Sequence, residues 1–156
     1  MTELEIPNFG ELLAEHLGGV PPEAYPFLLS QLERTAADRY RGWADDVPEH
    51  RDGILKCAAA EDEIADRVES MFPPSDNHRA LVMGIIPKAK ATYYSAFEGF
   101  TPAEQMTIQA NAERQGANAW QTLKGLYPEH ANELDALSEL EISSAEYLDQ
   151  LLPTLT

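Results

Sequence analysis

Apolar residues recur three and four positions apart over most of this chain, a spacing that gathers them on one face of an α-helix. No segment sustains the alternation of apolar and polar residues that a half-buried strand requires. The sequence therefore predicts an all-α fold without a β-sheet. The clearest apolar stripe lies between residues 22 and 43 and consists of Tyr25, Leu28, Leu29, Leu32, Ala36, Tyr40 and Trp43.

Proline and glycine divide the chain into helical segments. Gly18-Gly19 ends a short first helix, and capping-box patterns start two later ones, at Asp46-Val-Pro-Glu49 and Thr101-Pro-Ala-Glu104. Long helices joined by short connections are typical of a helix bundle. The expected helices lie at about 9–17, 22–43, 46–72, 77–97 and 101–127.

Two prolines mark the second half of the chain. Pro87 is expected to kink or split the helix at 77–97, because it lacks the N–H that an α-helix needs. Pro128 is expected to open a shorter helix to about residue 140, and Ser143 to cap a final one that ends near residue 152.

Length and charge limit the class of protein. At 156 residues the chain fits one domain over 1–156, which we expect to hold a bundle at about 22–127 and a C-terminal helical extension at about 128–152. The net charge of −16 disfavours nucleic acid and anionic membranes as partners. The first residues carry Glu and no basic residue, unlike a signal peptide, so the expected location is the cytoplasm.

Three glutamates fall on or beside the apolar stripes of the predicted helices. Because an α-helix turns about 100° per residue, Glu61 lies near the centre of its stripe, Glu113 in the middle of its own, and Glu33 at the edge. Glu63, in contrast, points to solvent. A carboxylate among apolar side chains is costly unless a shared proton, a basic partner or a metal ion compensates for it. The alternative is that these glutamates reach water at the ends of a bundle.

The segments around these glutamates resemble the metal-ligand helices of rubrerythrin-type ferritin-like proteins. Glu33-Arg-Thr-Ala-Ala-Asp-Arg-Tyr-Arg-Gly-Trp-Ala is similar to the first of these helices, Glu-x-x-Ala-x-x-x-Tyr-x-x-aromatic-Ala. Residues 60–68 resemble the second, Glu-x-Glu-His-Ala-x-Arg-Leu, with Ile64 at the position of the ligand His. Residues 110–116 resemble the fourth, Ala-x-Ala-Glu-x-x-His, with Gly116 in place of His. The resemblance covers about residues 29–127 and implies a ferritin-like four-helix bundle with a short N-terminal helix.

The family's full site holds two irons between a Glu from each of two helices and a Glu-x-x-His from each of the other two. Its chemistry oxidises Fe(II) and reduces peroxide or dioxygen. Here both His are absent, and the helix at 77–97 has no interior Glu, since its expected inner face is Leu81, Ile85, Ala89 and Thr92.

Two functions remain open. In one, Glu33, Glu61 and Glu113 are the ligands of a reduced site for one oxygen-preferring cation, iron or manganese, with a redox or metal-handling role. In the other, a metal-free ferritin-like protein acts as an interaction or scaffold module, as a homodimer or with a protein partner. The single Cys57 is expected to be a buried structural residue, and no catalytic residue is assigned.

Overall fold

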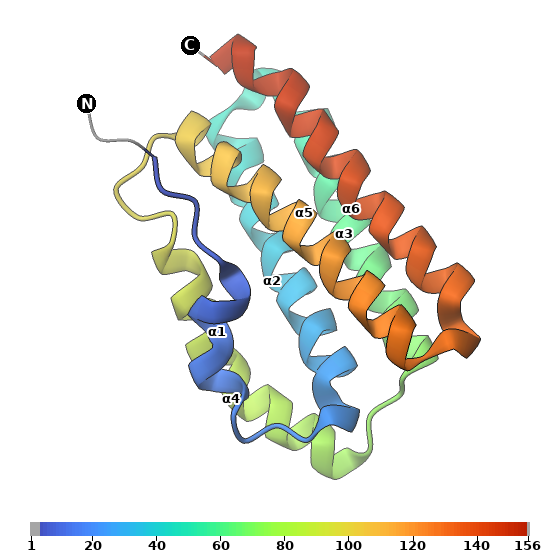
Figure 1. Cartoon of the computed structure of the whole chain (residues 1–156). Helices are drawn as coiled ribbons and strands as arrows, with labels where there is room; N and C mark the ends of the chain where they lie inside the picture. The colour runs from blue at the N-terminus through green and yellow to red at the C-terminus, as the bar shows by residue number, and fades with distance from the viewer. Residues whose placement is uncertain (1–3, 156) are drawn as a thin grey trace. The chain divides into compact units, whose positions relative to one another are not determined.

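The computed structural model describes residues 4–155, and within this range the chain is helical and has no strand, as the periodicity predicts. None of the helices in this range is long and apolar enough to cross a membrane. The α-helices, shown in Figure 1, are α1 (Phe9–Leu17), α2 (Tyr25–Asp46), α3 (Arg51–Met71), α4 (Asp76–Ser95), α5 (Pro102–Leu126) and α6 (Ala131–Leu151).

The described residues form two compact units, which we treat one at a time. The first, Gly10–Ala96, contains most of α1 together with α2, α3 and α4, and we call it the α2–α3 unit. The second consists of residues 97–155 together with the stretch up to Phe9, and we call it the α5–α6 unit.

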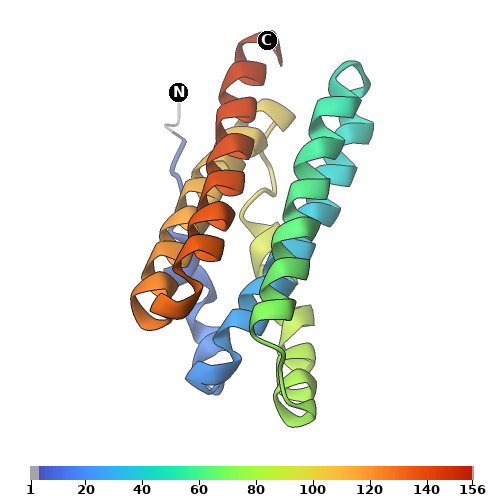
Figure 2. The same cartoon turned by 90° about the vertical axis from the view of Figure 1, so that its right-hand side faces the viewer.

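In the α2–α3 unit, α2 and α3 run antiparallel and lie side by side (Figure 1, Figure 2). Of the predicted α2 stripe, Leu28 and Trp43 are among the buried residues, whereas Tyr25 is exposed. The capping box predicted at Asp46 is wrong. The helix α2 continues through Asp46, and Pro48–His50 then forms a 3₁₀ turn, so α3 begins without a side-chain cap.

The helix α4 begins with Ser75 as its N-cap, which accepts a hydrogen bond from the His78 N–H at 3.1 Å, and it continues through Pro87. Its buried residues are Val82, Ala89 and Tyr93, and Val82 packs in a core cluster with residues of α2 and the segment before it. Leu81 is 38% exposed, so its assignment to the inner face is wrong. Of the other residues assigned to this face, Ala89 is buried and Ile85 packs against the same core cluster.

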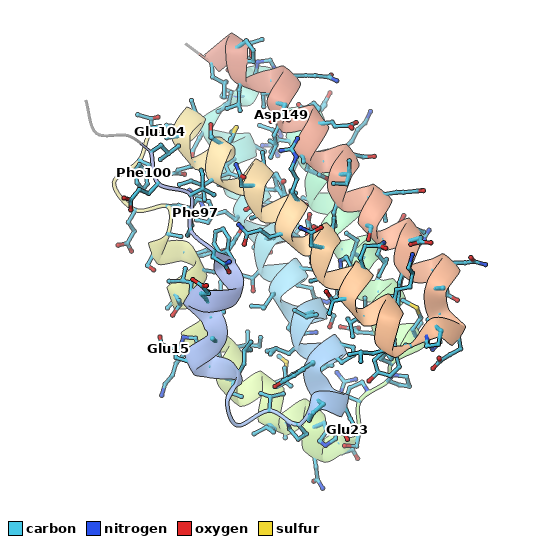
Figure 3. All side chains as sticks on the ribbon, viewed as in Figure 1. Glu15, Glu23, Phe97, Phe100, Glu104 and Asp149 are labelled. Carbon is cyan, nitrogen blue, oxygen red and sulfur yellow. The ribbon has the colours of Figure 1, made fainter. Side chains whose placement is uncertain are left out.

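In the α5–α6 unit, the capping box predicted at the start of α5 is confirmed. The Thr101 N–H donates to Oε1 of Glu104 at 3.1 Å, and the Glu104 N–H donates to Oγ1 of Thr101 at 3.2 Å. Figure 3 shows Glu104 at this end of the helix, with Phe97 and Phe100 in the preceding loop. Gly99 in that loop has a φ of +83°, a left-handed conformation that glycine adopts without strain.

The predicted break near Ser143 is wrong, because α6 is a single helix that packs along α5. Its buried side chains continue across the expected break, with Ser144 and Ala145 both buried. The hydroxyl of Ser138 donates to the carbonyl oxygen of Ala117 at 3.0 Å, which holds the two helices in contact. The expected C-terminal extension is thus a full-length helix paired with α5.

Candidate functional site

Glu33 and Glu61 form a carboxylate pair within the α2–α3 unit. Glu61 lies on α3 and is 1% exposed, while Glu33 lies on α2 and is half-buried. One carboxylate oxygen of Glu33 and one of Glu61 lie within 4.8 Å of each other. The predicted burial of Glu61 is confirmed, as is the outward direction of Glu63, which is exposed.

The packing of α3 explains why Glu61 is buried. Cys57 and Ala58 precede it by one turn, Ile64 and Ala65 follow it by one turn, and all four are buried against the rest of the molecule. Ile64 occupies the position at which the resembled family has an imidazole, and it is a core residue with no exposed surface. Of these four neighbours of Glu61, only Cys57 has a side-chain atom, its Sγ, that could bind a metal.

Arg34, which follows Glu33 on α2, forms ion pairs with three other carboxylates. It contacts Asp66 at 2.8 Å, Glu69 at 3.2 Å and Asp62 at 3.4 Å. The hydrogen bond that Arg34 donates to the carboxylate of Asp66 raises the pKa of Arg34, so the guanidinium stays charged at this position. The charge of Arg34 is thus directed to residues on the outer side of α3.

Glu113 lies in the α5–α6 unit and is 1% exposed, which confirms its predicted burial. Nε2 of Gln109, one turn earlier on α5, donates a hydrogen bond to Oε1 of Glu113 at 3.0 Å. Gln109 is itself buried. Its position four residues before Glu113 was a usable signal, because residues at i and i+4 are neighbours on a helix surface.

Sequence reasoning missed a fourth buried carboxylate, that of Glu141 on α6, which is 2% exposed. The signal was present, since Leu134, Ser138, Glu141, Ala145 and Leu148 follow one another at intervals of three and four. The expected break at Ser143 concealed it, because the stripe was divided between two short helices.

The carboxylate of Glu141 lies directly against Gly116 of α5. A Cβ atom built on Gly116 would be 2.9 Å from Cδ of Glu141 and 3.4 Å from Oε1, and closer still to Oε2. The resembled family has a His at this position. Here a carboxylate from the neighbouring helix fills the space that any side chain at 116 would enter.

One further polar group is buried on the same face of α5. The indole N–H of Trp120, a residue 1% exposed, has no hydrogen-bond acceptor among the described residues. Trp120 follows Gly116 by one helical turn and Glu113 by two. This N–H is therefore a donor that a bound oxygen atom would satisfy.

The four carboxylates offer oxygen ligands only, which suit Mn(II), Fe(II), Mg(II) and Ca(II) better than the softer metals. Bonds from such cations to oxygen are about 2.0–2.6 Å long, so two ligand oxygens of one cation lie at most about 4–5 Å apart. The separation within 4.8 Å between Glu33 and Glu61 falls in that range. The residues therefore fit an oxygen-bound cation, but not the family's complete site with its two His ligands.

Comparison of the chain with protein-family models, curated proteins and solved structures gives no match.

Proposed function

We propose that this chain binds an oxygen-preferring divalent cation, manganese or iron, through its buried carboxylates, as a reduced site of the ferritin-like kind. The observation that carries the proposal is the pair Glu33 and Glu61, whose carboxylate oxygens lie within 4.8 Å although Glu61 is almost fully buried. The sequence motifs also predict Glu113 as a ligand.

Charge repulsion supports a cation at this pair. Two ionised carboxylates about 5 Å apart repel each other by about 3 kcal/mol at an effective dielectric constant of 20. Burial adds the cost of removing Glu61 from water. A cation between the two removes both penalties, whereas a shared proton removes only part of them, since one carboxylate stays charged.

The bound metal would supply a Lewis acid or, as iron or manganese, a one-electron redox centre. Glu33 and Glu61 would provide anionic oxygens from two facing helices, and the aliphatic side chain of Ile64 would exclude water from one side of the pair. Each of these side chains lies on a regular helix, which holds it more rigidly than a loop does.

The second candidate function is a metal-free scaffold or interaction protein, which would act as a homodimer or with another protein. The replacement of both ligand histidines by Ile64 and Gly116 favours it. In this case the buried carboxyl groups would be neutralised by shared protons, and the role of the fold would be to present its strongly acidic surface.

A melting experiment separates the two functions. Wild type, Glu61→Gln and the exposed control Glu63→Gln are stripped with a chelator and melted with and without MnCl₂. If Glu61 is a cation ligand, Mn(II) is expected to raise the melting temperature of wild type and of Glu63→Gln by mass action. Glu61→Gln is expected to lose this rise. If Mn(II) shifts none of the three, and Glu61→Gln is as stable as wild type, the scaffold function is the better one.

A further inference from the structure

We propose that Glu141 is a further cation ligand beside Glu113, and that Gly116 is the positioning residue that admits its carboxylate to the face of α5 that carries Glu113. This inference deepens the proposed function and rests on it. Nothing in the sequence motifs assigns Glu141, because the resembled helices end before α6.

The contact between Gly116 and Glu141 is specific to the carboxyl group. All three terminal atoms of Glu141, Cδ, Oε1 and Oε2, lie within 3.4 Å of the place where a Cβ at residue 116 would be. The missing side chain thus leaves room for one carboxyl group. On the same helix, the Cα hydrogen of Gly125 points into open space, since a Cβ built there would meet no atom within 4 Å.

Glycine at position 116 is unfavourable for the helix unless another group occupies the space that a side chain would fill. Gly116 lies in the interior of a helix of 25 residues, where alanine is a better helix former. The backbone at Gly116 has no positive φ that would require glycine. The close approach of Glu141 is therefore the feature of the structure that accounts for the absence of a side chain.

The position of the carboxylate matters because Glu113 precedes Gly116 by three residues. Residues at i and i+3 are surface neighbours on a helix, with Cβ atoms about 5–6 Å apart. Gly116 thus brings the carboxylate of Glu141 to the helical turn that carries Glu113. Both residues are at least 98% buried, and the orphaned N–H of Trp120 follows one turn later.

In this geometry the second ligand of the pair lies on a different helix from the one in the resembled motif. The resembled motif has Glu and His three residues apart on one helix, whereas here the second ligand of the pair comes from α6 and is a carboxylate. An all-oxygen pair is expected to favour Zn(II) over Mn(II) less strongly than a Glu–His pair does, because Zn(II) gains more from an imidazole.

The test uses Gly116→Ala and Glu141→Gln, with Gly125→Ala and the exposed Glu139→Gln as matched controls on the same two helices. Each protein is stripped with a chelator and titrated with MnCl₂ by calorimetry, and each is melted without metal. We expect Gly116→Ala and Glu141→Gln to bind Mn(II) about 10–100-fold more weakly than wild type, the range seen when support of a metal ligand is lost. The controls are expected to match wild type.

The metal-free melts distinguish a positioning role from a purely structural one. The end of the Glu141 side chain can rotate away from an added Cβ, so metal-free Gly116→Ala is expected to be at least as stable as wild type. Unchanged Mn(II) affinity in both variants, while Glu61→Gln loses binding, would overturn this inference and leave the proposed function standing. Failure of wild type to bind Mn(II) at all would overturn both.

Discussion

Nε2 of Gln109 donates a hydrogen bond to Oε1 of Glu113 at 3.0 Å, and both side chains are buried on the same face of α5. A glutamine amide has two N–H donors and no charge, so it can orient a carboxylate without neutralising it. The hydrogen bond from Gln109 therefore orients the carboxyl group of Glu113 without adding a charge of its own. This arrangement differs from that of Arg34, which forms ion pairs with the carboxylates that it contacts.

Replacement of Gln109 by leucine is expected to lower the stability of the metal-free protein by about 1–3 kcal/mol, the cost of leaving a buried acceptor without its donor. Urea unfolding at pH 7 measures this change. Gln150→Leu makes the same substitution at an exposed position of α6 and is expected to be nearly neutral. Equal stability of wild type and Gln109→Leu would show that Gln109 does not support Glu113.

Ile64→His is expected to raise the affinity of the α2–α3 unit for Co(II) and Zn(II) by about tenfold or more, because it places an imidazole three residues after Glu61. The polar ring replaces a fully buried Ile64, which is expected to cost about 1–3 kcal/mol of stability. Titration with Co(II), followed by visible absorption, measures the affinity.

The control for this substitution is Ile54→His, which changes an equally buried residue of the same helix two turns away from Glu61. Ile54→His is expected to lose stability without gaining Co(II) affinity. Similar Co(II) spectra for the two variants would contradict the alignment of Ile64 with a ligand position. Histidine at position 116 is a different case, since it must displace the carboxylate of Glu141.

Local signals in the sequence predicted much of the fold. The bounds of α1 follow from Gly18-Gly19, and the start of α5 follows from Thr101 and Glu104, because each signal acts through neighbouring residues. The burial of Glu61 and Glu113 follows from helical spacing alone. None of these inferences needed knowledge of which helix packs on which.

The errors concern features that tertiary packing decides. Ser143 resembles an N-cap, but the stripe that continues through Ser144 to Leu148 packs on α5 and keeps α6 in one piece. Glu141 was missed for the same reason. Its contact with Gly116 joins residues on two different helices, and no spacing within one helix could reveal it. The resemblance to ferritin-like proteins remains a prediction.

Asp135 provides a pH-dependent test of the α5–α6 pairing. Its hydrogen bond from Nζ of Lys124, at 2.8 Å, and a second from Gln121 lower the pKa of the Asp135 carboxyl below its ordinary value of 3.8. Because the folded state favours the ionised form, the stabilisation is present above about pH 4 and is lost as the pH falls through the lowered pKa. Asp135→Asn is therefore expected to be slightly less stable than wild type at pH 7.

Urea unfolding of wild type and Asp135→Asn at pH 7 and at pH 2.5 checks this dependence. The difference between the two proteins is expected to shrink at the lower pH. Glu139→Gln, which alters an exposed acid on the same helix, is expected to show a smaller difference at pH 7. A difference for Asp135→Asn that grows on acidification would contradict the assigned direction of the shift.

Arg34 joins α2 to α3 through three carboxylates, and its removal is expected to destabilise the α2–α3 unit more than removal of any single exposed ion pair. The side chain of Arg34 is 34% exposed, so solvent screens each contact, and we expect Arg34→Gln to cost about 1 kcal/mol. Arg67→Gln is the matched control, since Arg67 forms an ion pair with Glu63 of the same helix, at 3.3 Å.

Salt supplies the second measurement, because the screening length falls from about 10 Å at 0.1 M to about 3 Å at 1 M. In urea unfolding the deficit of Arg34→Gln is expected to shrink at 1 M NaCl, whereas Arg67→Gln is expected to lie close to wild type at both concentrations. If Arg34→Gln is no less stable than Arg67→Gln at low salt, the Arg34 contacts do not stabilise the pairing of α2 with α3, and apolar packing alone accounts for it.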